Sequence, residues 1–156
     1  MLTKTGDDCL IMAQAHIAHD CVIGDGVIMA NAATLAGHVI IEDRANIGAY
    51  SGVHQFCRVG KEAYVGGYSV VVKDALPFAL TVGNHAKCYG LNITGMKRRG
   101  YSRAAIDALH HAFHLLLSAK LNTTQAVERI KQEITDSPEV SDLLRFIESS
   151  KRGVIK

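Results

Sequence analysis

The chain has 156 residues, enough for one full-sized domain or for one domain with a small appendage. Its formal net charge of +2 is too mild a basic excess to indicate a nucleic-acid-binding protein. No apolar run approaches the roughly 20 residues that cross a bilayer, and no signal peptide opens the sequence, so we expect a cytoplasmic protein without a transmembrane segment.

The side-chain composition points to a narrow interior. The sequence has 14 glycines against two prolines, no Trp, and only 6% aromatic residues, so the core must be built from small and branched aliphatic side chains. The four cysteines show neither CxxC pairing nor zinc-ligand spacing, and we expect free, buried thiols in a reducing compartment: Cys9, Cys21, Cys57 and Cys88.

A period of six residues runs through the first half of the chain. Every sixth position is a large aliphatic residue: Ile11, Ile17, Ile23, Met29, Leu35, Ile41, Ile47, Val53, Val59, Val65 and Val71. Four residues after each of these comes a small residue or Val, as at Cys21, Ala33, Ala45, Cys57 and Ala63. Gly or Ala often follows the aliphatic residue directly, as at Ala18, Gly24, Gly48 and Gly60.

This period predicts a β-helix, because neither an α-helix nor a flat strand repeats every six residues. One hexapeptide is a short strand plus a tight corner, and three of them make a triangular coil of 18 residues. We expect both series to point inward and the Gly or Ala to turn the corner, since a residue without a bulky side chain tolerates unusual dihedral angles.

The pattern fades at Pro77, and helix signals follow. Ser102 is a predicted N-cap of a helix from Ala104 to about Ala119, and Asn122 or Thr123 begins a second helix that ends near Thr135. Ser137, with a proline and an acidic residue after it, opens a third. We therefore predict a β-helix over residues 1–82, a connector over 83–100 and a helical domain over 101–156.

The repeat register is already present at Thr5 and Gly6, and no capping element precedes it in this sequence. A solenoid needs its terminal layer covered. We therefore expect either a truncated chain or one whose first coil lies against a partner.

Histidines are concentrated at the outward positions of the coils. Residues 18 apart stack on one face, so Asp20 is predicted beneath His38, and His19 beneath Gly37; His16 and His54 lie nearby. Three uses remain open from spacing alone. The group can supply acid–base chemistry, it can hold zinc as in hexapeptide carbonic anhydrases, or it can be surface polarity without a function.

The run from Ala15 to Cys21 resembles the AHIAHDC signature of the UDP-N-acetylglucosamine acyltransferase family. Further matching segments extend the resemblance from near residue 2 to the C-terminus: 31–38, 49–56, 83–86, 90–93, 97–100 and 152–153. The resemblance implies a left-handed parallel β-helix, a homotrimer with each cleft shared between neighbouring coils, and no cofactor or bound metal.

The implied activity is transfer of an (R)-3-hydroxyacyl group from acyl carrier protein to the glucosamine 3-hydroxyl of UDP-N-acetylglucosamine, the first step of lipid A biosynthesis. His19 would be the general base, Asp20 would orient its imidazole, and the backbone N–H near Gly37 would receive the oxyanion. The remaining residues would bind substrates: His16, His38 and His54 the sugar and its phosphates, Asn92, Arg98 and Arg99 the UDP moiety, and Gln55, Gly67 and His85 the acyl chain.

Two departures from the family pattern stand out. Family members carry a preceding half of the β-helix with Asp and Lys contacts to the sugar nucleotide, and this sequence does not include it. Thr94 stands where an acidic residue is common. Besides the acyltransferase, two alternatives remain: a zinc-dependent enzyme of the carbonic anhydrase type, and an inactive fragment that keeps the fold and the trimer.

Overall fold

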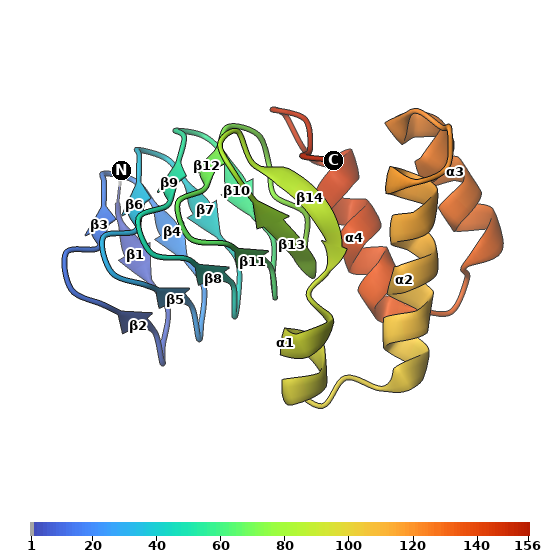
Figure 1. The fold of residues 1–156 in the computed structure, drawn as a ribbon, viewed down its shortest axis with the longest axis horizontal. Coiled ribbons are helices and arrows are strands. Elements are labelled where there is room, and N and C mark those ends of the chain that lie inside the picture. The colour runs from blue at the N-terminus through green and yellow to red at the C-terminus, as the bar shows by residue number, and fades with distance from the viewer. Residues whose placement is uncertain (1) are drawn as a thin grey trace.

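The computed structural model describes residues 2–156, which form a parallel β-helix of about four coils followed by helices packed against its C-terminal end (Figure 1). This arrangement confirms the predicted fold class. Among residues 2–156, no helix combines the length and apolar character that a membrane span requires.

The coils stack into three parallel sheets, one on each side of a triangle. The strands of the first sheet are β1 (Lys4–Thr5), β4 (Val22–Ile23), β7 (Ile40–Ile41) and β10 (Arg58–Val59). The second sheet holds β2 (Leu10–Ile11), β5 (Ile28–Met29), β8 (Asn46–Ile47) and β11 (Tyr64–Val65), and the third β3 (His16–Ile17), β6 (Thr34–Leu35), β9 (Gly52–Val53) and β12 (Val70–Val71). Each paired strand is offset by 18 residues from its neighbour, as the hexapeptide period predicts.

Three columns of corners join these sheets. The first corner leads from the third sheet to the first and contains residues 18–21, 36–39 and 54–57. The second corner leads from the first sheet to the second, at residues 24–27, 42–45 and 60–63. The third corner leads from the second sheet to the third, at residues 30–33, 48–51 and 66–69.

The two predicted inward series form the core of the β-helix. From Cys21 onward the small series is buried, and from Ile23 onward the aliphatic series is buried, each with at most 3% exposure. All four cysteines are free thiols; Cys21 and Cys57 are buried, while Cys9 and Cys88 are half-buried. Burial raises the pKa of Cys21, Cys57 and Cys88.

The prediction that Gly or Ala turns the corner was wrong. The left-handed backbone conformation falls two residues later, on every sixth residue, and nearly all of these residues carry side chains, including Asp20, His38 and Glu62, with φ between 58° and 61°. The small residues are needed for a different reason. At Gly48 an added Cβ would lie 2.5 Å from the Gly67 nitrogen of the next coil, so close stacking of the coils excludes large side chains there.

The second sheet continues where the repeat pattern fades. β13 (Ala79–Val82) pairs in parallel with β11, and β14 (Lys87–Leu91) then pairs antiparallel with β13. The short helix α1 (Ile93–Arg98) follows. The predicted connector thus contains regular structure, and the division at residues 82 and 100 stays a prediction.

The three predicted helices are α2 (Arg103–Leu117), α3 (Thr123–Glu133) and α4 (Pro138–Glu148). Their caps are Ser102, Asn122 and Ser137, whose side chains each accept a hydrogen bond from the backbone N–H three residues on. A second apolar core joins these helices to α1 and the coil end, with Phe78 and Met96 among its buried members.

Candidate active site

The first corner brings His19, Asp20, Gly37 and His38 together. His19 and Asp20 follow β3, and Gly37 and His38 follow β6 one coil further along. The backbone N–H of His38 donates to the carbonyl of His19 at 3.1 Å, which ties the two coils in register at this point. The predicted stacking of Gly37 over His19, and of His38 over Asp20, is thereby confirmed.

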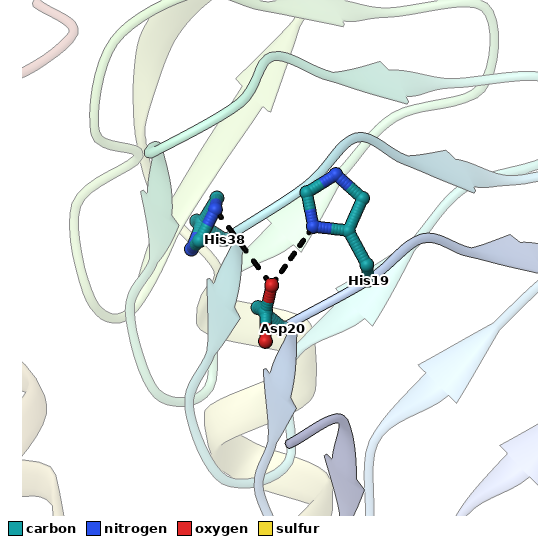
Figure 2. A group of neighbouring side chains, drawn as sticks. All are labelled: His19, Asp20 and His38. Atoms are coloured by element: carbon teal, nitrogen blue, oxygen red, sulfur yellow. Dashed lines mark hydrogen bonds and ion pairs between the residues drawn. The ribbon is translucent and has the colours of Figure 1, made fainter. Parts of the chain in front are cut away.

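Asp20 lies between the two imidazole rings (Figure 2). Its Oδ2 is 2.9 Å from His19 Nδ1 and 3.8 Å from His38 Nε2, so the first contact is a hydrogen bond and the second is an ion pair only when His38 is protonated. The Asp20 side chain is 15% exposed, whereas that of His19 is 72% exposed. The His19 imidazole is therefore accessible to solvent, and its Nδ1 is hydrogen-bonded to the half-buried carboxylate of Asp20.

The left-handed corner conformation directs the Asp20 carboxylate toward this position. Asp20 has a φ of 61°, and its backbone N–H donates to Thr3 Oγ1 at 2.8 Å. An ionised carboxylate only accepts hydrogen bonds, so His19 Nδ1 carries the proton and donates to Asp20. The His19 Nε2 is then left with a free lone pair, which is the state a general base requires.

Gly37 leaves room for the His19 ring. A Cβ added at Gly37 would lie 2.6 Å from His19 Cε1 and 2.7 Å from His19 Nε2, so any side chain there would collide with the imidazole. Within residues 2–156 the Gly37 N–H donates to no protein acceptor. At the same hexapeptide position on the second corner, the N–H groups of Asp25 and Lys61 each bond to a carboxylate. The site therefore places an available backbone donor beside the imidazole.

Phe56 extends this column by one more coil, and sequence reasoning assigned it no separate part. Its ring stacks on that of His38 with centroids 4.6 Å apart and planes 9° from parallel. Although Phe56 is 54% exposed, it covers one face of His38. The 18-residue spacing from His38 was the signal that could have revealed this contact.

His16, His54 and Gln55 lie around the same corner. All three are exposed; His16 pairs with Thr34 on β3 and β6, and His54 and Gln55 follow β9 on the coil beyond Gly37. His54 Nδ1 is 3.2 Å from the Gln55 carbonyl oxygen. No hydrogen bond or ring contact joins these side chains to His19 among the described residues.

Gly67 and His85 lie elsewhere. Gly67 is part of the third corner, and His85 follows β13 in the loop that returns along β12. A Cβ on Gly67 would meet only the backbone of Ala49, at 3.4 Å or more, so a side chain fits there. Gly66 differs, because its Cβ would lie 2.8 Å from Val82 Cγ2 and would disturb the packing.

Asn92, Arg98 and Arg99 line a cavity of about 590 Å³ between the outer face of the second sheet and α1. Asn92 caps α1, and its Nδ2 donates to the Glu62 carbonyl at 3.1 Å. Arg99 Nε contacts the buried Glu62 carboxylate at 2.9 Å, whereas no ion pair engages Arg98 among the described residues. The two arginines therefore differ in their contacts, and the assignment of both to the UDP moiety stays a prediction.

The predicted site residues thus fall into three groups. At or next to the first corner lie His16, His19, Asp20, Gly37, His38, His54 and Gln55. Gly67 lies at the third corner and His85 in the loop along β12, while Asn92, Arg98 and Arg99 line the cavity along the second sheet. One chain alone does not bring these groups together.

The carboxylate and the two imidazoles also form a potential metal-binding group, since their ligand atoms all lie within 4.8 Å of one another. Zinc accepts this combination of ligands. A metal at this position would have to displace the hydrogen bond between His19 and Asp20.

Comparisons with known proteins give the chain a family. Residues 74–155 match the model described as "Udp N-acetylglucosamine O-acyltransferase; Domain 2", and residues 2–37 match the bacterial transferase hexapeptide repeat. An acyl-[acyl-carrier-protein]–UDP-N-acetylglucosamine O-acyltransferase of Aliivibrio salmonicida is 46% identical over 155 residues, which are 99% of this chain and 59% of the relative. A relative with the same name from Burkholderia lata is 42% identical and covers 99% and 61% of the two chains.

The solved UDP-N-acetylglucosamine O-acyltransferase of Moraxella catarrhalis superposes with a TM-score of 0.95 at 40% identity, covering 99% of this chain and 60% of that structure. The chain thus spans about 60% of the length of the relatives that it matches. The match of its C-terminal domain and its similarity to these relatives show that the chain, with its hexapeptide repeats, belongs to the UDP-N-acetylglucosamine O-acyltransferase family.

Proposed function

We propose that this chain carries the catalytic corner of an acyltransferase that moves an (R)-3-hydroxyacyl group from acyl carrier protein to the 3-hydroxyl of UDP-N-acetylglucosamine. Relatives at 37–46% identity carry the matching name. The observation that carries the proposal is the exposed His19 ring, bonded through Nδ1 to Asp20 and lying against Gly37. In this reaction the chain acts in the first step of lipid A biosynthesis.

The chemistry follows from the His19 geometry. His19 Nε2 removes the proton from the sugar hydroxyl as its oxygen attacks the thioester carbonyl. The developing oxyanion accepts a hydrogen bond from the Gly37 N–H. When the tetrahedral intermediate collapses, the C–S bond breaks, and the protonated imidazole returns its proton to the carrier thiolate. Asp20 stabilises the transient imidazolium and needs no proton itself.

The other residues bind the two substrates. His16, His38 and His54 line the cleft and contact the sugar and its phosphates. Arg98 presents a guanidinium to the diphosphate, while Asn92 and Arg99 complete the nucleotide cavity. Gln55, Gly67 and His85 line the acyl groove, and the open space at Gly67 favours long acyl chains.

We further propose a cytoplasmic homotrimer in which each site is shared between subunits. The separation of the three groups of residues onto different corners supports this arrangement, because one chain does not unite the base with the nucleotide cavity. A neighbouring copy that turns its second sheet toward the first corner would unite them. The reaction needs no cofactor, since every proton it moves passes through His19.

The direct test is an assay of the purified protein with UDP-N-acetylglucosamine and hydroxyacyl carrier proteins of several chain lengths, with products identified by mass spectrometry. We expect a mono-acylated sugar nucleotide and no product from free acyl acid. Absence of any product would favour the inactive fragment. Stoichiometric zinc, together with activity lost to a chelator, would instead favour the metal-dependent enzyme.

The shared site has its own test. His19→Ala and Arg98→Ala are expected to be weakly active alone, because each breaks every site of its trimer. If the site is shared, mixing the unfolded variants and refolding them together restores part of the activity, since some sites then combine two intact halves. Activity that stays at the level of the separate variants would place both residues in one subunit's site.

A further inference from the structure

A buried carboxylate, Glu62, joins the β-helix to the segment around α1. Its side chain is only 2% exposed, and burying an ionised carboxylate costs several kcal/mol unless partners compensate for the lost water. Three side chains do so: Arg44 Nε at 2.5 Å and Tyr101 Oη at 3.2 Å donate to Oε1, and Arg99 Nε forms an ion pair with Oε2 at 2.9 Å. Both carboxylate oxygens are therefore engaged.

The corner geometry explains why the carboxylate points this way. Glu62 has a φ of 58°, and its backbone N–H donates to the Asp43 carbonyl at 3.0 Å, so the coil itself sets the direction of the side chain. Arg44 is the corner residue one coil below, at a φ of 56°. The hydrogen bond to Glu62 raises the pKa of Arg44, whereas burial, followed by the Glu62 charge, raises the pKa of Tyr101 and keeps its phenol a donor.

The same residue also holds the start of α1. The Glu62 carbonyl accepts from Asn92 Nδ2, and the Asn92 Oδ1 accepts from the Gly95 N–H at 3.2 Å. Arg99 lies directly after α1 and forms an ion pair with the carboxylate. Both ends of the short helix are thus tied to one residue of the coil, with Arg98 between them.

The cavity beside this cluster carries an excess of positive charge. Arg44, Arg98 and Arg99 all line it, with Glu62 as its acidic residue, so two positive charges remain, one for each phosphate of a nucleoside diphosphate sugar. Glu62 accepts a hydrogen bond from Arg44 Nε and forms an ion pair with Arg99 Nε. The terminal nitrogens of a guanidinium carry further donors, and these can serve an anion in the cavity.

We propose that Glu62 is a positioning residue of the nucleotide-diphosphate subsite, holding Arg44 and Arg99 and fixing α1 so that the guanidinium groups converge on the diphosphate. This inference rests on the proposed function, because it takes the cavity to be the place where the sugar nucleotide binds. It adds Glu62, Arg44 and Tyr101 to that subsite.

The test is Glu62→Gln, with UDP as the probe and calorimetric titration as the measurement, below the unfolding temperature of every variant. The substitution keeps the shape of the side chain but removes its charge. If Glu62 positions the arginines, UDP binding weakens about tenfold, and KM for the sugar nucleotide rises while kcat changes little, since His19 lies on another corner. If Glu62 merely tempers the positive charge, the same variant binds UDP more tightly. Unchanged or tighter binding overturns the proposal.

Two further variants keep the experiment decisive. Glu62→Asp retains the charge but shortens the reach, so it is expected to bind UDP several-fold more weakly even if the glutamine variant does not fold. Glu42→Gln is the matched control: Glu42 is a half-buried carboxylate that accepts from the Lys61 N–H and does not line this cavity, so its loss should leave UDP affinity unchanged. If the unaltered protein binds no UDP, the nucleotide part of the proposed function fails too. If it binds UDP and both Glu62 variants match it, only this inference fails.

Discussion

The first and second corners each stack ionisable side chains in a column, with 18 residues between successive members. The two columns nevertheless differ in exposure and in bonding. At the first corner Asp20, His38 and Phe56 lie one above another, and the His19 side chain beside them is 72% exposed. At the second corner Arg44 lies below Glu62, which is 2% exposed, accepts hydrogen bonds from Arg44 and Tyr101, and forms an ion pair with Arg99. The backbone conformation is the same at both, with φ near 60°.

The difference arises from what covers each corner. The His19 ring contacts Gly37 and His38 of the next coil and remains mostly exposed, whereas Arg99 and Tyr101, from outside the repeats, fold back onto the second corner. An exposed imidazole can accept a substrate proton, while a fully paired carboxylate can only hold its neighbours in place. We therefore expect substitutions at the first corner to change rate with little effect on stability, and substitutions at the second to change stability and binding.

His19→Ala is the largest expected effect. The variant should lose at least about 100-fold in kcat, because the reaction loses its general base, while its melting temperature stays within about a degree of the unaltered protein, since the ring is mostly exposed. Steady-state kinetics and thermal unfolding measure the two quantities. His114→Ala, an exposed histidine on α2, is the control and should change neither. Near-normal turnover in His19→Ala would remove it from the mechanism.

Gly37→Ala should have a smaller effect of the same kind. The new Cβ would lie 2.6 Å from His19 Cε1, so the imidazole must rotate away from its place, and kcat should fall about tenfold or more. Because the His19 side chain is 72% exposed, it can move into solvent without disturbing the core, so stability should hardly change. Gly52→Ala is the matched control, because a Cβ there meets no heavy atom within 4 Å. Equal activity in both variants would mean that the position of the ring at Gly37 is unimportant.

Tyr101→Phe, at the second corner, has the smallest expected effect of the three substitutions. It removes one of the two side-chain hydrogen bonds to the Glu62 carboxylate and should lower the free energy of unfolding by about 1 kcal/mol, with kcat unchanged. Because burial and the Glu62 charge raise the pKa of Tyr101, its contribution is complete below the unfolded tyrosine pKa of about 10 and is lost as the pH rises through the higher folded value. Denaturant titrations near pH 8 and pH 11 should therefore show the variant closest to the unaltered protein at high pH. A constant difference would contradict this account.

The sequence predicted the first corner better than the second for a physical reason. A solenoid repeats its backbone, so the six-residue period alone placed Gly37 over His19 and His38 over Asp20. The period also identified both inward series, because only one side-chain size fits each position of so narrow a core. These contacts follow from the 18-residue length of a coil alone.

What the sequence did not reveal lies where the period stops. β14 runs antiparallel, and α1 spans six residues, too short for a hydrophobic period to show. The contact of Arg99 with Glu62 depends on how this segment folds back, which no local pattern encodes. The Arg44 and Glu62 pair was nevertheless accessible, since the two residues are 18 apart like His38 and Asp20.

The fixed coil length also limits how the gene can change. A one-residue insertion within the coils would move every later side chain to a different position in its hexapeptide and expose the aliphatic series. Only duplications or deletions of a whole coil keep the register, and each shifts the later corners along the axis by one strand spacing of about 4.8 Å. A coil inserted between Asp20 and Gly37 would preserve the fold but separate His19 from Gly37 and His38. Length variation is therefore confined to coils outside this pair.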